Sequence, residues 1–310
     1  MTNELNRHAA VVGLGSMGGA MAATLHRAGW SVSGFDPSSE ARSAAAANGI
    51  AVVEDVAELA GTPYVVLSLP SAAIVRATVP HLLTKPGTVA IVDTTTSEPA
   101  TSAEMAGLAQ QHRAHFVDSP VSGGNAGAAT GMLSAFLGGS EDSIEAARPV
   151  LDALTGGQYT HIGPIGSGNV VKLLNNILCA TNLAAVGEAL DIAAAYGIDL
   201  GIAAQAISGA SGGSKVSSAM FPNWILSGTF DSGFALGLMA RDVSLALDVA
   251  AQHGAAPQVL SGTNQAWQKA LAELGPKADF VQMPSTVTTA TDALSPTAIN
   301  AAKESASATR

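Results

Sequence analysis

A glycine-rich loop near the amino end constrains the fold of this chain more than any other feature. Three glycines spaced as G-x-G-x-x-G, at positions 13, 15 and 18, follow an apolar run and precede a helical pattern. This spacing allows a tight turn and lets a pyrophosphate approach the backbone, where the start of the helix offers free N–H groups. The pattern predicts an α/β sheet that binds a dinucleotide. The predicted loop residues are Gly13, Leu14, Gly15, Ser16, Met17 and Gly18.

The acid that follows the second predicted strand indicates which dinucleotide binds. Asp36 ends the strand expected at 31–36, about twenty residues beyond the glycines, where a carboxylate accepts hydrogen bonds from ribose hydroxyls. Its charge would repel a 2′-phosphate, and no arginine follows it directly, so NAD is favoured over NADP. The alternative is that Asp36 merely opens a turn with Pro37, which requires the glycine loop to be a coincidence.

Strand and helix patterns alternate through the first half of the chain, which predicts a doubly wound parallel sheet. Ligands of such sheets bind at the carboxyl ends of the strands. The segments just after those ends, at 69–71, 93–96 and 118–124, are rich in Ser, Thr and Gly and suit hydrogen bonds to a cofactor and a carboxylate. Ordinary turn chemistry is the alternative. The expected strands are 9–14, 31–36, 50–53, 64–69, 89–93, 115–118, 133–137 and 158–161, with a helix near 143–154.

One very long helix, expected at 167–196, opens the second half of the chain. Ser167 is the predicted N-cap and Gly197 the predicted stop. The helix is apolar almost all round, which is typical of a helix buried on most sides. Lys172 and Asn176 lie four residues apart, so they share a face and could reach the same ligand. A lysine at a helix end beside a hydrogen-bonded asparagine is the alternative.

Helical periodicity continues to the end of the chain, so two domains are expected. Residues 1–165 are predicted to form a Rossmann-type dinucleotide-binding domain, and 166–310 an all-helical domain for substrate binding and oligomerisation, joined by the long helix. The further helices are expected at 203–207, 221–226, 236–251 and 259–274. The small polar residues from 301 onward are expected to fray.

Composition excludes several classes of function. The net charge of −10 argues against nucleic acid or an anionic membrane as partner, because both require clustered Lys and Arg. Cys179 is the single cysteine and the histidines are scattered, so no disulfide and no metal site are expected. A signal peptide and a membrane span are not expected, which indicates a cytoplasmic protein. A small anionic substrate stays compatible, since one buried cation suffices for it.

Three segments resemble the β-hydroxyacid dehydrogenases, the 3-hydroxyisobutyrate dehydrogenase-like family, over almost the whole chain. Residues 13–22 resemble the cofactor motif, 118–124 the substrate loop, and 166–176 the start of the catalytic helix. The resemblance implies an oxidoreductase that transfers hydride between a 3-hydroxy acid and NAD, giving the semialdehyde or keto acid, or the reverse reduction. It also implies a homodimer or homotetramer.

Residue roles follow from the resemblance alone. Lys172 would be the catalytic lysine, which takes or returns the hydroxyl proton, and Asn176 would hydrogen-bond the substrate. Arg241 stands where the family usually has lysine, which keeps the charge but changes the geometry; by its spacing alone, the pair Arg241-Asp242 is more typical of a surface ion pair. The implied carboxylate-binding residues are Ser122, Gly123 and Gly124, and the implied nicotinamide-lining residues are Leu69, Pro70 and Thr96.

Substrate choice and alternative functions remain open. Lys215 lies in a segment that the resemblance places over the substrate pocket, where many relatives carry an aromatic residue, so it could bind a second anionic group of the substrate; a lysine pointing to solvent is the alternative. Imine reductases share the implied architecture but usually lack the lysine that Lys172 supplies. A dinucleotide-binding redox sensor without catalysis is the non-enzymatic alternative.

Overall fold

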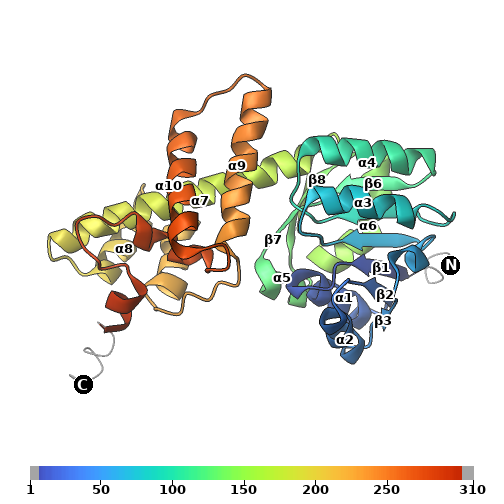
Figure 1. Ribbon diagram of the computed structural model, residues 1–310, viewed down its shortest axis with the longest axis horizontal. Coiled ribbons are helices and arrows are strands. Elements are labelled where there is room, and N and C mark those ends of the chain that lie inside the picture. Colours follow the sequence, from blue (N-terminus) through green and yellow to red (C-terminus); the bar gives the residue numbers. More distant parts are fainter. Residues whose placement is uncertain (1–6, 302–310) are drawn as a thin grey trace. The chain divides into compact units, whose positions relative to one another are not determined.

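The computed structural model describes residues 7–301 and divides into two compact units, Met1–Lys172 and Leu173–Arg310 (Figure 1). The first unit is built on a sheet and the second on helices. The domain boundary predicted after residue 165 falls slightly earlier than this division. The polar tail that was expected to fray lies, from residue 302 onward, outside the described residues.

The sheet of the first unit has the predicted doubly wound order. Its first six strands run in the order β3-β2-β1-β4-β5-β6, and every neighbouring pair is parallel. The chain order reverses between β1 and β4, so the crevice that binds ligands in such sheets lies at the carboxyl ends of these two strands. The strands are β1 (His8–Val12), β2 (Ser31–Phe35), β3 (Ala51–Val52), β4 (Tyr64–Leu67), β5 (Ala90–Asp93) and β6 (His115–Asp118).

The far edge of the sheet departs from the parallel arrangement of the first six strands. β8 (Ser134–Gly138) runs antiparallel to β6 and to the short strand β7 (Val121–Ser122), while β9 (Tyr159–Gly163) is parallel to β8. The chain reverses here because α5 (Gly124–Thr130) is short and ends at Gly131, whose φ of 69° is a left-handed turn. The two further strands predicted at 133–137 and 158–161 are thus present as β8 and β9.

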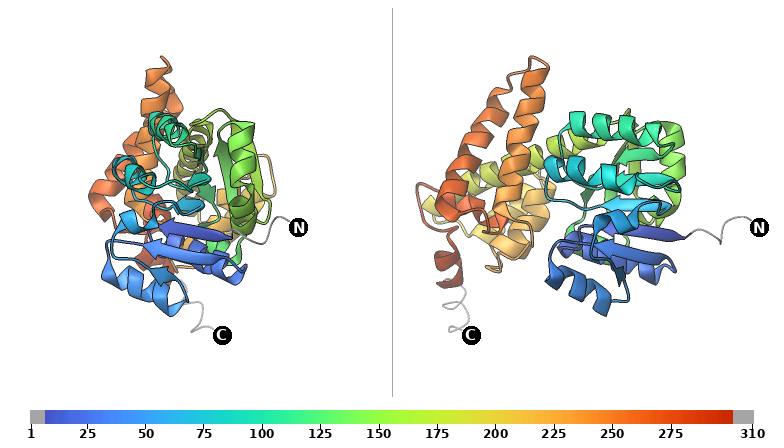
Figure 2. Two further views of the ribbon diagram at one scale, coloured as in Figure 1. Left: turned by 90° about the vertical axis from the view of Figure 1, so that its right-hand side faces the viewer. Right: turned by 45° about the vertical axis from the view of Figure 1, so that its right-hand side comes forward.

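Helices cover both faces of this sheet (Figure 2). Successive residues of β1 show why: Ala9 and Val11 join one hydrophobic cluster, and Ala10 and Val12 join the other. Strands buried on both faces are therefore apolar throughout instead of alternating with polar residues. The covering elements are α1 (Ser16–Arg27), α2 (Ser39–Ala47), η1 (Val56–Leu59), α3 (Ala72–Leu82), α4 (Pro99–Gln111) and α6 (Glu141–Thr155).

The second unit is mostly helical, as predicted. Its core includes Trp267, which is fully buried and donates its indole N–H to the carbonyl of Ala180 at 3.1 Å. Ala235 and Asp279 form one isolated antiparallel bridge. The elements are α8 (Leu200–Ser208), the π-helix η2 (Val216–Ile225), α9 (Leu236–Gln252), α10 (Gln258–Leu274) and the 3-10 helix η3 (Phe280–Thr286).

The long helix α7 runs over Ser167–Ala195, close to the predicted bounds. Ser167 is the first helical residue and not the cap that was predicted, whereas Gly197 follows the end of the helix with a φ of 75°. By length and composition α7 would pass as a membrane span, a test that core helices of soluble proteins also pass. Leu183 and Leu190 are fully buried in the core of the second unit. Leu174, Leu178 and Ile192 are exposed by 45%, 56% and 62%, so within this chain the helix is not buried on most sides as predicted.

Candidate active site

Two glycines of the amino-terminal loop stand where no larger residue fits. Gly13 has a φ of +90° and donates its N–H to the carbonyl of Phe35 at 2.8 Å, and a Cβ on it would lie 2.1 Å from the carbonyl oxygen of Ser68. A Cβ on Gly18 would lie 1.8 Å from the carbonyl oxygen of Gly13. The loop therefore packs directly on the ends of β2 and β4, with α1 pressed against it.

The middle glycine leaves space for a ligand at the start of α1. No atom lies within 4 Å of a Cβ built on Gly15, which is the residue before the helix. Among the described residues no side chain caps α1, and its first turn holds no acid. Ser16 is exposed there, while Met17 packs against the core. An open glycine beside uncapped N–H groups fits the pyrophosphate of a dinucleotide.

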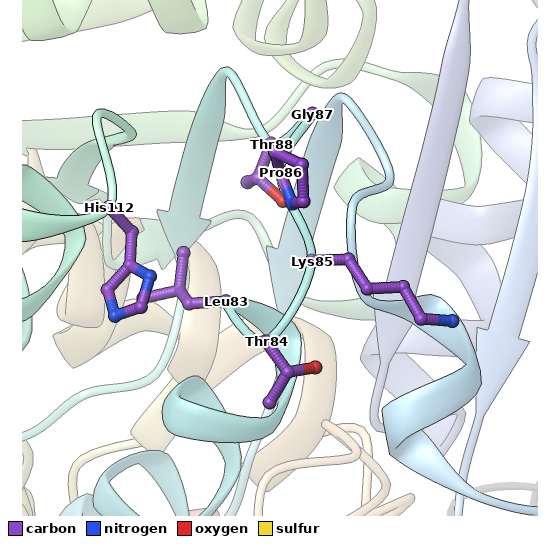
Figure 3. Close-up of a pocket in the computed structure, with 7 residues that line it drawn as sticks. All are labelled: Leu83, Thr84, Lys85, Pro86, Gly87, Thr88 and His112. Carbon is purple, nitrogen blue, oxygen red and sulfur yellow. The ribbon is translucent and has the colours of Figure 1, made fainter.

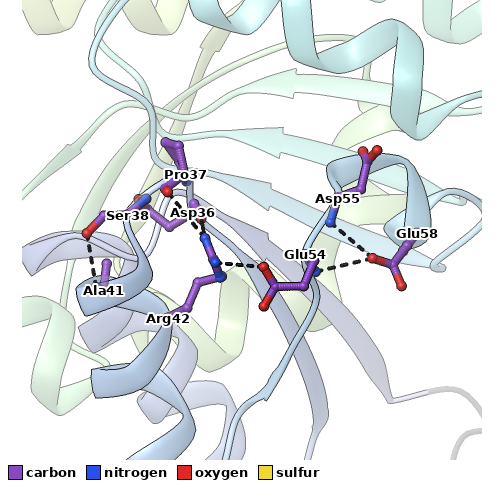
Figure 4. Close-up of polar contacts among 8 residues, drawn as sticks. All are labelled: Asp36, Pro37, Ser38, Ala41, Arg42, Glu54, Asp55 and Glu58. Atoms are coloured by element: carbon purple, nitrogen blue, oxygen red, sulfur yellow. Dashed lines mark hydrogen bonds and ion pairs between the residues drawn. The ribbon is translucent and has the colours of Figure 1, made fainter.

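Asp36 is hydrogen-bonded to the glycine loop. Its Oδ2 accepts a hydrogen bond from the backbone N–H of Leu14 at 2.8 Å, and its Oδ1 accepts one from Ser38 at 2.8 Å. Arg42 of α2, which is not among the predicted site residues, also lies here. It donates a hydrogen bond to the backbone carbonyl of Asp36 at 2.7 Å (Figure 4). The carboxylate thus sits at the carboxyl end of β2 beside the loop, where a ribose would bind.

The loops after β4 and β5 are joined to each other at the same edge of the sheet. Thr95 accepts a hydrogen bond from the backbone N–H of Leu69 on its hydroxyl, at 3.1 Å, and Thr94 donates its hydroxyl to the carbonyl of Leu67 at 2.6 Å. Pro70 is exposed and Thr96 is partly buried. The predicted nicotinamide-lining residues thus come from two connected loops next to the glycine loop.

The predicted carboxylate-binding segment forms the end of β7 and the start of α5. Ser122 is the last residue of β7, and Gly123 and Gly124 have φ values of 122° and 59°, which favour glycine. A Cβ on Gly124 would meet no atom within 4 Å. The backbone is therefore open at Gly124, whereas a Cβ on Gly123 would lie 3.5 Å from the side chain of Leu133.

The start of α7 is held by a buried carboxylate that was not assigned this role from the sequence. Asp118, at the end of β6, accepts hydrogen bonds from the backbone N–H groups of Gly166 at 2.7 Å and of Asn169 at 2.9 Å. Both N–H groups lie in the first turn or just before it, where they lack partners within the helix. Asp118 therefore does the capping that was predicted for Ser167.

The side chain of Asn169 ties the same turn to the loop after β5. Its carbonyl oxygen accepts a hydrogen bond from the backbone N–H of Ser97 at 2.9 Å, and its amide donates to the hydroxyl of Ser102 at 3.0 Å. All three side chains are buried. Lys172, partly buried, follows one turn later on α7. The lysine predicted to be catalytic therefore belongs to a helical turn that is fixed to the strand ends.

A second buried carboxylate ends the neighbouring strand. Asp93 pairs in register with Asp118, and its Oδ1 accepts a hydrogen bond from the backbone N–H of Thr95 at 3.0 Å. Its Oδ2 has no hydrogen-bond partner among the described residues. Burial, together with the nearby charge of Asp118, raises the pKa of Asp93 to about 7, against the lowering effect of Thr95. Burial also raises the pKa of Asp118.

In the second unit, Asn176 is part of a buried polar cluster. Its amide donates to Oδ2 of Asp242 at 2.7 Å, and Arg241 donates to Oδ1 of the same carboxylate at 2.8 Å and 3.1 Å. Asp242 is only 1% exposed. The surface ion pair suggested by the spacing of Arg241 and Asp242 was therefore a wrong interpretation. Asp242 is a candidate site residue that the sequence argument missed.

Two further features are Lys215 and a pocket of the first unit. Lys215 is exposed, directly before η2. A pocket of about 200 Å³ lies at the amino ends of β5 and β6, the edge opposite to the glycine loop, so we do not assign it to the site (Figure 3). Its lining residues are Leu83, Thr84, Lys85, Pro86, Gly87, Thr88 and His112. Within residues 7–301, no group of three or more His, Cys, Asp or Glu is arranged to hold a metal ion.

Comparison with known proteins agrees with this architecture. The family model of the NAD-binding domain of 6-phosphogluconate dehydrogenase matches residues 8–163, and that of NADP-dependent 3-hydroxyisobutyrate dehydrogenase matches residues 166–287. A probable 3-hydroxyisobutyrate dehydrogenase of Mycobacterium tuberculosis is 35% identical, over 79% of this chain and 86% of the relative. The 2-(hydroxymethyl)glutarate dehydrogenase of Eubacterium barkeri is also 35% identical, over 76% of this chain and 80% of the relative.

Solved structures give the same assignment. The Mycobacterium tuberculosis 3-hydroxyisobutyrate dehydrogenase with L-serine has a TM-score of 0.85 at 32% identity, over 92% of this chain and 100% of that chain. An imine reductase of Streptomyces aurantiacus has a TM-score of 0.61 at 18% identity, over 91% and 99%, a likeness that concerns the fold alone. From the glycine loop, the start of α7 and these relatives we conclude that the chain belongs to the NAD(P)-using β-hydroxyacid dehydrogenase family.

Proposed function

We propose that this protein is an NAD-dependent dehydrogenase of 3-hydroxy acids. The observation that carries the proposal is the anchored start of α7: Asp118 and Asn169 hold the turn before Lys172 against the strand ends that carry the cofactor residues. A general acid or base needs this fixed placement, because proton transfer depends on geometry before it depends on pKa. A redox sensor without catalysis would need the glycine loop and Asp36 but not an anchored lysine.

The proposed reaction removes two hydrogens from the alcohol. The substrate hydroxyl gives its proton to the neutral amine of Lys172, and the hydrogen on the same carbon leaves with its electron pair. Bound NAD supplies the acceptor for that hydride. The carbon becomes a carbonyl and Lys172 becomes an ammonium group, which returns its proton in the reverse reduction. Ser122, Gly123 and Gly124 are the proposed binding residues for the substrate carboxylate, and Asn176 is a proposed hydrogen-bond donor or acceptor for the substrate.

The preference for NAD over NADP is supported by the placement of Asp36. Its carboxylate accepts hydrogen bonds from Leu14 and Ser38, so it is fixed beside the loop where an adenosine ribose would lie. A fixed negative charge there favours two ribose hydroxyls and disfavours a 2′-phosphate. Arg241, in the second unit, remains a proposed cofactor residue in place of the usual lysine.

The proposed substrate class is a small anionic hydroxy acid with a second anionic or polar group. Lys215 is exposed and keeps its charge available to such a group. The relative from Eubacterium barkeri, named for 2-(hydroxymethyl)glutarate, gives independent support, because that substrate carries two carboxylates. The same net charge of −10 that argues against nucleic acid and anionic membranes favours solubility. The bacterial dehydrogenases among the relatives support the proposal of a cytoplasmic enzyme.

The test is reduction of NAD and of NADP, followed by absorbance, over a panel that contains 3-hydroxyisobutyrate, 2-(hydroxymethyl)glutarate and L-serine. We expect turnover with NAD, and a higher kcat/KM for the dicarboxylate than for 3-hydroxyisobutyrate. Lys215→Ala should raise KM for the dicarboxylate only, while Lys277→Ala, at another exposed lysine of the second unit, should change neither KM. Dinucleotide binding without turnover of any hydroxy acid would favour the redox sensor, and equal effects of both lysine variants would remove Lys215 from the site.

A further inference from the structure

Arg42 is bound on two sides in the loop that follows β2 (Figure 4). Its Nη1 donates to the backbone carbonyls of Asp36 at 2.7 Å and Pro37 at 3.2 Å, and its Nη2 lies 2.7 Å from Oε2 of Glu54. The side chain of Arg42 is only 15% exposed, whereas that of Glu54 is 80% exposed. The guanidinium is therefore held against the backbone of the ribose-binding loop by an acid that reaches it from the solvent side.

Glu54 is placed by the start of η1 and not by the loop that it contacts. The carboxylate of Glu58 accepts hydrogen bonds from the backbone N–H groups of Glu54 at 3.2 Å and Asp55 at 3.0 Å, and the side chain of Asp55 accepts one from Ala57. This reciprocal capping box fixes the backbone between β3 and η1. The contact between Glu54 and Arg42 thus joins two separately stabilised loops.

The charges around this contact favour a cofactor without a 2′-phosphate. Residues 36–58 contain five acids and a single cation, Arg42. An arginine near the end of β2 is the group that accommodates the 2′-phosphate of NADP in Rossmann folds. Arg42 lies at this position, but its guanidinium is already paired with a carboxylate, which is the stronger kind of hydrogen bond. A 2′-phosphate at this position would have to displace Glu54 from Arg42.

We propose that Glu54 is a specificity-determining residue, which holds Arg42 on the loop backbone and so denies this cation to the 2′-phosphate of NADP. The inference rests on the proposed use of NAD and extends it to a pair of residues that lie outside the glycine loop. Asp36 repels the 2′-phosphate directly, whereas Glu54 acts through Arg42. Loss of Glu54 should free the guanidinium of Arg42 to bind a 2′-phosphate. Asp36 would still accept hydrogen bonds from the ribose hydroxyls of NAD.

The experiment measures the binding of NADH and NADPH to the full-length protein by fluorescence titration, without substrate. Glu54→Gln should lower the Kd for NADPH by about threefold to tenfold, because the guanidinium of Arg42 loses its paired charge and becomes available to the 2′-phosphate. The Kd for NADH should stay within about twofold. The matched control is Glu104→Gln, which removes the same charge from an exposed ion pair with Arg76 and should leave both Kd values unchanged.

The role of Arg42 is tested by a double variant. In Arg42→Met/Glu54→Gln the gain in NADPH affinity should disappear, while Arg42→Lys/Glu54→Gln, which keeps a charge and serves if the methionine variant does not fold, should retain part of it. An unchanged NADPH affinity in Glu54→Gln, an equal gain in Glu104→Gln, or a gain that survives Arg42→Met would each overturn the proposal. Failure of the wild type to bind either dinucleotide would instead overturn the proposed function, and the inference with it.

Discussion

Lys172 is the residue on which the proposed chemistry depends most directly. Replacing it by methionine keeps the length of the apolar stem and removes the amine that takes the proton. We expect Lys172→Met to lower kcat by at least 10²–10⁴-fold, the usual contribution of general acid–base catalysis. Binding of NADH should persist, because the glycine loop and Asp36 are unchanged. Steady-state rates and a fluorescence titration measure the two effects.

The control for this variant is Lys85→Met, at an exposed lysine on the opposite edge of the sheet. It removes the same charge and should leave kcat unchanged. A Lys172→Met enzyme with nearly normal turnover would contradict a role of this amine in proton transfer.

Asp242 supports a second prediction at the residue scale, because a single carboxylate accepts from both Asn176 and Arg241. In Asp242→Asn the amide that replaces one oxygen can no longer accept, so one buried donor loses its partner. Loss of a hydrogen bond to a charged group costs about 1.5–3 kcal/mol, so we expect kcat/KM for the hydroxy acid to fall by about tenfold to a hundredfold. The matched variant Asp248→Asn, at an exposed position of the same helix, should have normal kcat/KM; equal losses in both would show that Asp242 has no special part in the site.

Residues differ in how far the sequence reveals their roles. The glycine loop and Asp36 are predictable, because their function depends on local backbone geometry and on a fixed distance along the chain. The role of Asp242 is not, because its partner Asn176 is distant in sequence and helical spacing does not tell which neighbours bury a charge. The role of Arg42 could not be predicted for a similar reason. Arg42 follows Asp36 by six residues, and only the folded loop brings its guanidinium to the backbone carbonyl of Asp36.

At the scale of elements, the start of α7 depends on Asn169. Its side chain satisfies the backbone N–H of Ser97 and the hydroxyl of Ser102, and all of these groups are buried. Asn169→Ala leaves that N–H without a partner, so we expect the free energy of unfolding to fall by about 1–3 kcal/mol. Urea unfolding measures it. Asn175→Ala, at an exposed position of the same helix, should cost much less, and a cost equal to that of Asn169→Ala would argue against the anchoring role.

The adjoining ends of β5 and β6 predict a pH dependence of stability. The pKa of Asp93 rises on folding from 3.8 to about 7 because the carboxyl group is buried. The folded protein therefore favours the protonated form of Asp93. The contribution of this group to the free energy of unfolding is complete below pH 3.8 and is lost as the pH rises through 7. The loss amounts to about 4 kcal/mol at most. Asp93→Asn should remove this loss and gain stability relative to the wild type between pH 4.5 and pH 8, measured by urea unfolding. A stability difference that does not vary over this range, as expected for the exposed control Asp142→Asn, would contradict it.

Helices and strands could be predicted where the hydrophobic periodicity of each segment and the order of the segments along the chain indicate the same structure. Alternating strands and helices gave the parallel sheet up to β6, since parallel neighbours require a crossover helix. β7 was missed because its two residues lie in a segment rich in Ser, Gly and Pro that is typical of a loop. The antiparallel direction of β8 could not be predicted because apolar strands look alike in either direction. Asp118 caps α7 from a distant strand, so sequence neighbours of the helix pointed to Ser167 instead.

At the scale of the whole molecule, exposed apolar side chains lead us to predict that the chain associates with itself. Four of them lie close together in sequence, at the end of α7, in the turn that follows and in α8: Ile192, Tyr196, Ile198 and Ile202, with Tyr196 84% exposed. We call these residues the 192–202 patch. Large exposed apolar side chains that follow one another so closely are typical of interfaces between subunits. The homodimer or homotetramer expected from the family is thus a specific prediction about this surface.

Light scattering coupled to size-exclusion chromatography tests it. The wild type should have at least twice the mass of one chain, because burying apolar surface contributes about 25 cal/mol per Å² and the 192–202 patch recurs on both copies of a symmetric dimer. Tyr196→Glu/Ile202→Glu places two charges on each side of that contact, so the double variant should shift towards the mass of a single chain while its circular dichroism stays that of a folded helical protein. Ile74→Glu, at an exposed apolar residue of the first unit, should leave the mass unchanged. A monomeric wild type, or an oligomer that tolerates both charges of the double variant, would show that a second copy does not cover this patch.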